Sequence, residues 1–246
     1  MELNSQRDKG MVNAEPQSRF HLMDIKQILT GDDAEGGLRN YLIWGTAGVF
    51  FLQVFATGLG FVTNVLLARL LGATEYGVYT YVFAWVGLLT VLSMFGFGRL
   101  LVREIASYIT NTRWGLIHGI IRYVATRSFL ISIGVAIIAG LLTWLFKENL
   151  NPRMFPAFWI AMIALPFLTL TLLNEQALQG FKKVVLGRIP QVFVRTPLFI
   201  CSLLLVYWLY PQDLDAVIAI GLQASAISVG FLVGVWLLYL ITRKQV

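Results

Sequence analysis

Charged residues are scarce in this chain. Asp, Glu, Lys and Arg make up only 13% of its 246 residues, whereas soluble domains carry roughly 25%. Because 57% of the residues are hydrophobic, a soluble globular protein is excluded. The alternating segments that form a membrane-spanning β-barrel do not occur either. The composition therefore predicts an all-α, polytopic membrane protein.

Cysteine and histidine are nearly missing. The single cysteine, Cys201, excludes an intrachain disulfide, and the two histidines, His21 and His118, stand alone outside the apolar runs. The sequence has no zinc-binding spacing and no HExxH, GxSxG or P-loop signature. We therefore expect no metal, no cofactor and no enzymatic activity.

Six apolar runs are long enough to cross a membrane, for which about 20 residues are needed. They cover residues 41–67, 78–101, 124–146, 155–179, 191–210 and 216–241. Residues 104–123 place apolar side chains at helical spacing, which predicts an amphipathic helix lying on the headgroups. We expect a polar cytoplasmic tail over residues 1–40 and a six-helix transmembrane lobe over residues 41–246.

Positive charge is distributed unevenly between the two sides of this topology. With the N-terminus inside, the inner segments hold Arg99, Arg103, Arg113, Arg122, Arg127, Lys182, Lys183, Arg188, Arg195, Arg243 and Lys244. The outer turns hold Arg69, Lys147 and Arg153. Because Lys and Arg concentrate in cytoplasmic loops, we predict that both termini are cytoplasmic. The net charge of +6 is thereby explained without a nucleic-acid partner.

Two stretches resemble the start of Wzx-type polysaccharide flippases. They are GFVTNVLLARLLGATEYGVY at residues 60–79 and FGFGRLLVREIA at residues 95–106. These flippases belong to the multidrug/oligosaccharidyl-lipid/polysaccharide exporter superfamily, whose fold is that of the MATE transporters. The resemblance implies an inner-membrane protein that flips a lipid-linked oligosaccharide, with an anionic undecaprenyl-linked sugar as substrate and no covalent change.

The length departs from the pattern of that superfamily. Its members have twelve to fourteen helices in two related lobes around a central cavity, and six spans correspond to the N-terminal lobe alone. One lobe cannot form both walls of an alternating-access cavity. We therefore expect a fragment, a truncated gene product, or a half that pairs with a second lobe or a second copy.

Two other functions stay open. A small-molecule efflux antiporter of the same superfamily would have acidic residues deep in this lobe, where the spans hold essentially only Glu175. A non-transporting scaffold of a polysaccharide-synthesis complex would need no second half, but the polar residues inside the spans would then have no role.

Arg69 is the first candidate for substrate binding. Its guanidinium group either extends to the outer headgroups or binds the phosphate of a lipid-linked sugar in a fork. The resemblance favours the second role, because arginines near this position, here in LLAR at residues 66–69, are implied to contact a lipid pyrophosphate.

Polar residues inside the spans are the other candidates. Gln53 and Asn64 in the first span and Gln179 in the fourth either line a hydrophilic path or form hydrogen bonds between helices. Glu175 either pairs with an arginine (Arg99, Arg103 or Arg195) or acts as a titrating or ligand-binding carboxylate.

Arg99 and Arg103 follow the second span. They either anchor the chain at the inner leaflet or meet anionic lipid headgroups there. These two arginines complete the set of residues that we consider for substrate binding.

Overall fold

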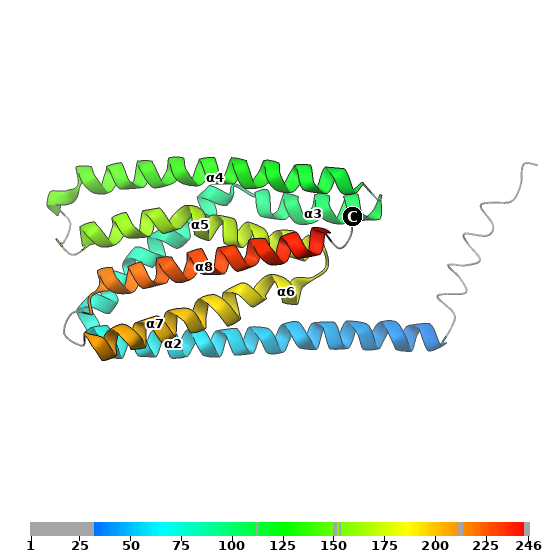
Figure 1. Cartoon of the computed structure of the whole chain (residues 1–246), viewed down its shortest axis with the longest axis horizontal. Helices are drawn as coiled ribbons and strands as arrows, with labels where there is room; N and C mark the ends of the chain where they lie inside the picture. Colours follow the sequence, from blue (N-terminus) through cyan, green and yellow to red (C-terminus); the bar gives the residue numbers. More distant parts are fainter. Residues whose placement is uncertain (1–31, 112, 150–151, 153, 211–213, 244–246) are drawn as a thin grey trace, which may run out of the picture. The chain divides into compact units, whose positions relative to one another are not determined.

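The computed structural model describes residues 32–111, 113–149, 152, 154–210 and 214–243. These residues are helical or lie in short turns, without strands (Figure 1). The chain divides into two units, Met1–Phe51 and Leu52–Val246. In the first unit the helical part begins at Asp32, so most of the predicted polar tail lies outside the described residues.

The helices follow one another with short connections. In chain order they are α2 (Asp32–Met94), α3 (Phe97–Thr110), α4 (Trp114–Leu145), the 3₁₀ turn η1 (Lys147–Asn149), α5 (Met154–Gly180), α6 (Val184–Ile189), the π-helix η2 (Pro190–Arg195), α7 (Thr196–Leu209) and α8 (Ala216–Arg243).

The helices are apolar enough to confirm a multi-pass membrane protein. Among the described residues, five helical segments have the length and composition of membrane spans: Ala47–Met94, Gly115–Leu145, Met154–Gly180, Val184–Leu209 and Ala216–Arg243. The first segment has 48 residues, or about 72 Å at 1.5 Å per residue, which is enough for two crossings of a hydrocarbon core about 30 Å thick. About six spans, as predicted, are therefore present.

Gly72 separates the first two spans. Its φ of 78° and ψ of 171° interrupt the helical backbone of α2, in a region that is essentially restricted to glycine. The carboxylate of Glu75, three residues after this break, accepts a hydrogen bond of 3.1 Å from the backbone N–H of Ala216, at the start of α8. The predicted polar turn is thus tied to the last span.

A second break lies between α2 and α3. Phe95 and Gly96 both have positive φ values, of 42° and 77°. The second span therefore ends at Met94 rather than at residue 101. The residues of the predicted amphipathic helix 104–123 are divided between the end of α3 and the start of α4, on either side of a turn.

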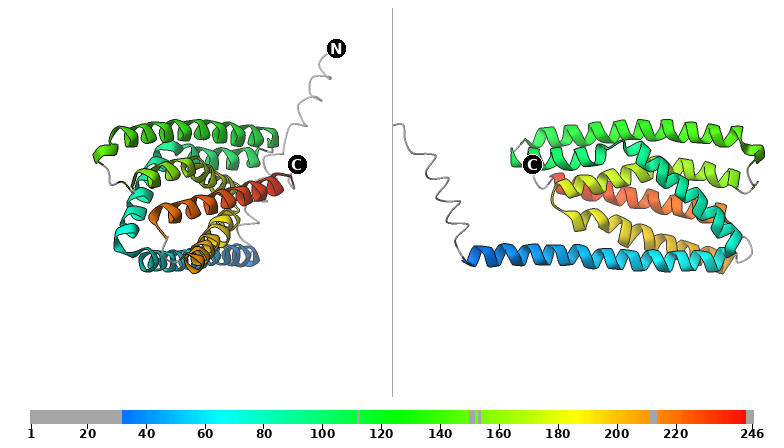
Figure 2. Two further views of the ribbon diagram at one scale, coloured as in Figure 1. Left: turned by 60° about the vertical axis from the view of Figure 1, so that its left-hand side comes forward. Right: turned by 180° about the vertical axis from the view of Figure 1, so that it is seen from behind.

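α5 is the central helix of the second unit. It packs against α3, α4, α6 and α8 (Figures 1 and 2). One apolar cluster contains Leu165 with Val82, Phe199 and Ile220, from α2, α7 and α8. A second joins α3, α4, α5 and α8. At Gly180 an added Cβ would lie 2.9 Å from the Cβ of Ile105, so only glycine permits the close contact of α5 with α3.

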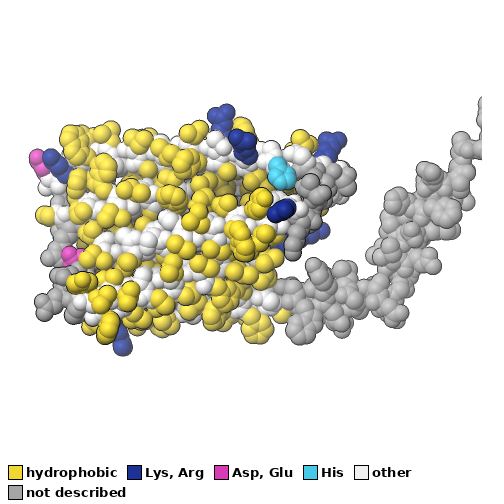
Figure 3. Space-filling view, in the orientation of Figure 1, with side chains coloured by type: hydrophobic (Ala, Val, Ile, Leu, Met, Phe, Trp, Pro, Cys, Tyr) yellow, Lys and Arg dark blue, Asp and Glu magenta, His cyan; other side chains and the backbone are white. Residues whose placement is uncertain are grey.

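The two ends of the second unit hold different elements. One end holds η1 and the start of α8, and the opposite end holds the α5–α6 turn and the end of α8 (Figures 1 and 2). Lys182 and Lys183 lie in the α5–α6 turn. Figure 3 shows one face covered by apolar side chains, with charged groups toward its edges. Such a surface is suited to lipid.

Candidate functional site

A polar cavity of about 270 Å³ lies among α2, η2, α7 and α8. Small side chains on α2 leave room for it, because Ala56 and Gly60 face it from successive turns. Its polar lining consists of Thr63, Asn64, Tyr79, Gln191, Arg195, Thr196 and Gln223. All of these residues belong to apolar helices that are long enough to span the membrane.

Arg195 supplies the positive charge of the polar cavity. It is the last residue of the π-helix η2, which begins at Pro190. The hydroxyl of Thr196 donates a 3.0 Å hydrogen bond to the carbonyl oxygen of Gln191, five residues back. π-helical turns are rare, and many lie at functional sites. Here the turn places Gln191 and Arg195 in the wall of one cavity.

The charge of Arg195 has no protein counter-ion within the part of the chain that the structure describes. The residues that line the cavity there include no carboxylate, and the ion pairs there involve other arginines. An unpaired charge at membrane depth is costly. The cavity is therefore suited to an anionic group.

Amide groups line the same cavity as Arg195. Gln223 of α8 is only 9% exposed, and its Oε1 atom has no hydrogen-bond partner among the described residues. Asn64 donates to the carbonyl oxygen of Gly60 at 2.9 Å and accepts from the hydroxyl of Tyr76 at 3.3 Å. The cavity thus combines one cation with amide groups that bind hydroxyl and phosphate oxygens.

A second polar group, which we call the Glu175 cluster, consists of Gln53, Glu175, Gln179 and Arg188. The Nε of Arg188 donates to Oε1 of Glu175 at 3.1 Å, and its Nη1 donates to Oε1 of Gln53. Gln179 donates to the same carboxylate oxygen at 3.5 Å. Three spans are thereby connected through one guanidinium group.

The Glu175 cluster and the polar cavity are adjacent. Gln191 lines the polar cavity and also a small pocket that contains Glu175 and Asn174. The Nδ2 of Asn174 is buried without a partner among the described residues. Arg188 and Arg195 are seven residues apart, about 10 Å along a helix. Polar side chains therefore continue from the cluster into the cavity.

The family model for polysaccharide biosynthesis proteins matches residues 43–246. The chain belongs to this family. The match covers every described span and confirms the resemblance to Wzx-type flippases seen at residues 60–79 and 95–106. Comparison with curated proteins and with solved structures gives no match.

In this polysaccharide biosynthesis protein, four of the predicted site residues lie in the two polar groups. Asn64 lines the polar cavity, and Gln53, Glu175 and Gln179 belong to the Glu175 cluster. The partner of Glu175 is Arg188, which was not among the three arginines considered for it.

The three predicted arginines lie elsewhere. Arg69 is exposed on α2, one turn before Gly72. Arg99 and Arg103 lie on the exposed side of α3, where the side chain of Arg103 is 76% exposed and pairs with Glu104 at 3.0 Å. None of the three lines the polar cavity. Their contact with phosphate or with headgroups stays a prediction.

The sequence interpretation did not single out Arg195 and Gln223 as site residues. Arg195 was counted among the inner charges, although it lies within the fifth apolar run. An ionisable residue inside a span is a functional candidate by default, and this signal was available. Gln223 carried no comparable signal, because only the packing of α8 against the other helices places it at the cavity.

Proposed function

We propose that this protein moves an anionic, lipid-linked oligosaccharide across the membrane, and that the polar cavity receives its phosphate-bearing headgroup. The observation that carries the proposal is Arg195, a cation within a membrane span that faces a polar cavity and has no carboxylate partner among the described residues. Membership in the polysaccharide biosynthesis protein family supports a role in the same process.

The chemistry of the lining fits such a headgroup. A guanidinium group binds phosphate oxygens through two parallel N–H donors. The amides of Asn64, Gln191 and Gln223 can bind the sugar hydroxyls or the remaining phosphate oxygens. No covalent bond changes in this process, and the hydrocarbon tail stays in the bilayer.

The volume limits what one cavity can hold. About 270 Å³ is slightly below the range for small-molecule sites, roughly 300–1,000 Å³. The cavity therefore accommodates the phosphate and the adjoining sugar, and a longer oligosaccharide needs a further wall. A second lobe or a second copy of the chain would supply that wall, as in transporters built from two repeats.

The antiporter alternative receives less support. A cation-coupled efflux site would need a carboxylate in the cavity, and the described lining contains none. Glu175 is instead engaged by Arg188. The scaffold alternative makes a different prediction, because a scaffold would bind no lipid-linked sugar through Arg195.

Replacement of Arg195 tests the proposal. We expect Arg195→Gln to weaken binding of a polyprenyl-diphosphate sugar by about 10- to 100-fold, since hydrogen bonds to charged groups contribute about 1.5–3 kcal/mol. Arg195→Lys should recover part of the affinity, because the charge returns without the planar fork. Titration of the purified protein with the labelled lipid measures the affinity, and transfer of the lipid across vesicle membranes measures transport.

Arg127→Gln is the matched control. Arg127 lies on α4, 5.4 Å from the ring centroid of Tyr123, and does not line the cavity. The Arg127→Gln protein should bind and transport the lipid-linked sugar as well as the unmodified protein does. Equal affinities in all variants, or an equal loss in Arg127→Gln, would contradict the proposal.

A further inference from the structure

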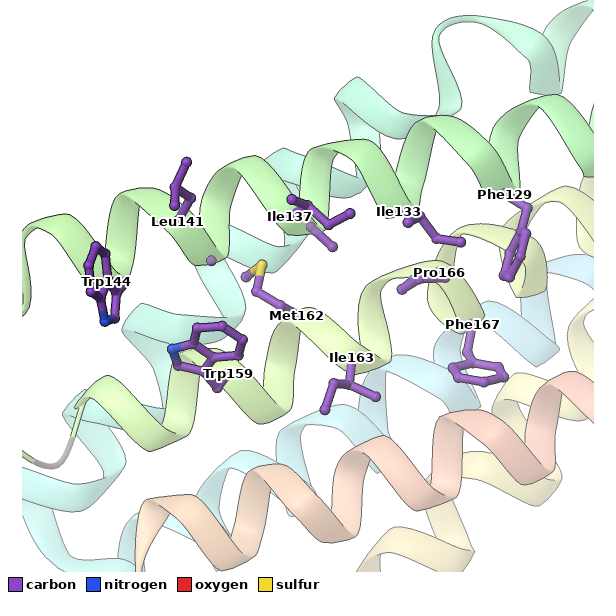
Figure 4. Close-up of a pocket in the computed structure, with 12 residues that line it drawn as sticks. Phe129, Ile133, Ile137, Leu141, Trp144, Trp159, Met162, Ile163, Pro166 and Phe167 are labelled. Atoms are coloured by element: carbon purple, nitrogen blue, oxygen red, sulfur yellow. The ribbon is translucent and has the colours of Figure 1, made fainter.

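A long apolar groove lies between α4 and α5 and has a volume of about 640 Å³. Figure 4 shows the side chains of the two helices that line it, with Trp144 and Trp159 near one end and Phe129 and Phe167 near the other. Apart from the indole N–H groups, the side chains that line it are hydrocarbon or thioether. The groove therefore fits a hydrophobic chain.

Two residues with little bulk keep the groove open. Gly140 has no side chain, and a Cβ added there would meet only Cη2 of Trp159, at 3.9 Å. Pro166 presents only its ring to the groove (Figure 4). Aromatic side chains flank both positions and form the walls of the groove.

A basic side chain lies beyond each end of this groove. The ammonium group of Lys147 lies 5.6 Å from the ring centroid of Trp144. Arg122 precedes Phe129 by seven residues, or two helical turns, and so shares its face of α4. The 25 residues from Arg122 to Lys147 span about 38 Å, close to the 40–45 Å of a bilayer with its headgroups. Both cations therefore reach headgroup level.

We infer that this groove binds a hydrocarbon chain of an anionic phospholipid, with the lipid phosphate at Lys147. Lys147 lies beside Trp144 at one end of the groove. Its positive charge can therefore pair with the negative phosphate of a lipid whose hydrocarbon chain occupies the groove. A second protein copy is disfavoured, because the groove is apolar along its whole length and offers no polar groups to fix a partner in register.

The groove is separate from the site proposed for transport. It lies on α4 and α5, whereas the polar cavity lies on α2, η2, α7 and α8, and the two share no lining residue. The lipid in the groove is therefore a bound component of the protein and distinct from the translocated substrate. Its binding does not depend on the proposed transport function.

Native mass spectrometry of the purified protein tests the inference. The protein is equilibrated with equimolar phosphatidylglycerol and phosphatidylcholine of identical chains, and the retained lipids are counted. We expect the unmodified protein to retain one phosphatidylglycerol. Gly140→Leu should lower the retention about tenfold, since a leucine displaces several methylene groups from the groove. Gly134→Leu makes the same change on α4 outside the groove, where an added Cβ meets nothing within 4 Å, and should leave retention unchanged.

Substitution of the charged residues beside Trp144 gives a second readout, which does not require a bulky residue in the groove. Lys147→Gln should lower the preference for phosphatidylglycerol about threefold, and Glu148→Gln, which removes the neighbouring carboxylate of η1, should raise it. Equal retention by both glycine variants, an unchanged lipid preference in Lys147→Gln, or a bound second copy that Gly140→Leu releases would overturn the inference.

Discussion

At the scale of single residues, Arg188 has a role that no local pattern indicates. Its guanidinium group contacts Glu175 on α5 and Gln53 on α2. The side chain of Glu175 is 12% exposed and that of Arg188 is 33% exposed. A charge pair in this position is largely withdrawn from water, and removal of one partner leaves the other uncompensated.

We therefore expect Glu175→Leu to destabilise the protein by about 2 kcal/mol, the order of a hydrogen bond to a charged group. This corresponds to a fall of about 5 °C in the melting temperature, which a fluorescence thermal scan in detergent measures. Glu104→Leu removes a carboxylate whose partner Arg103 is 76% exposed, and it should change the melting temperature by about 1 °C or less. Equal shifts in the two variants would show that the Glu175 cluster adds no particular stability.

At the scale of elements, the boundaries of the helices depend on a few backbone conformations. Gly72 adopts positive φ between the first two spans, and Gly96 adopts it before α3. The combination of positive φ and extended ψ at Gly72 is one that residues with a Cβ essentially do not adopt. The direction of the second span therefore depends on this glycine.

Gly72→Ala should cost about 1–3 kcal/mol, because alanine pays the strain of that conformation. Gly77→Ala is the matched control, since Gly77 lies in the helical part of α2 with no atom within 4 Å of an added Cβ. Alanine there should be neutral or stabilise by up to about 1 kcal/mol. Thermal unfolding of both variants checks the difference, and a Gly72→Ala protein as stable as Gly77→Ala would refute the role of the conformation.

At the scale of the whole lobe, the topology of the second unit places the α5–α6 turn and η1 at opposite ends (Figure 1). The positive-inside tendency predicts that the α5–α6 turn, with Lys182 and Lys183, faces the cytoplasm. We therefore predict that η1 faces outward and that both termini are cytoplasmic.

Cysteine labelling tests this orientation. In a Cys201→Ser background, which removes the single cysteine, we expect a membrane-impermeant maleimide to label Glu148→Cys on intact cells. Lys183→Cys should react only after the membrane is opened. The reverse pattern would show the opposite orientation, and labelling of both positions on intact cells would contradict the single membrane crossing by α5 that separates them.

The composition and the apolar runs alone were sufficient to predict an all-helical, multi-pass protein with about six spans, and the stretches around Arg69 and Arg103 were sufficient to identify the family. Hydrocarbon forces every buried backbone group to pair within its own segment, so long apolar runs determine helices locally. Helix ends were less predictable. The break at Phe95 and Gly96 lies inside a run whose apolar character continues beyond it.

The grouping of side chains was decided only by tertiary structure. Glu175 on α5 pairs with Arg188 on α6 across the α5–α6 turn, and Gln223 reaches the cavity of Arg195 from a different span. In a membrane span, apolar residues face both lipid and neighbouring helices, so the hydrophobic pattern does not tell which face is inward. The sequence alone therefore determined the helices and the family of this protein, whereas packing decided which polar residues meet.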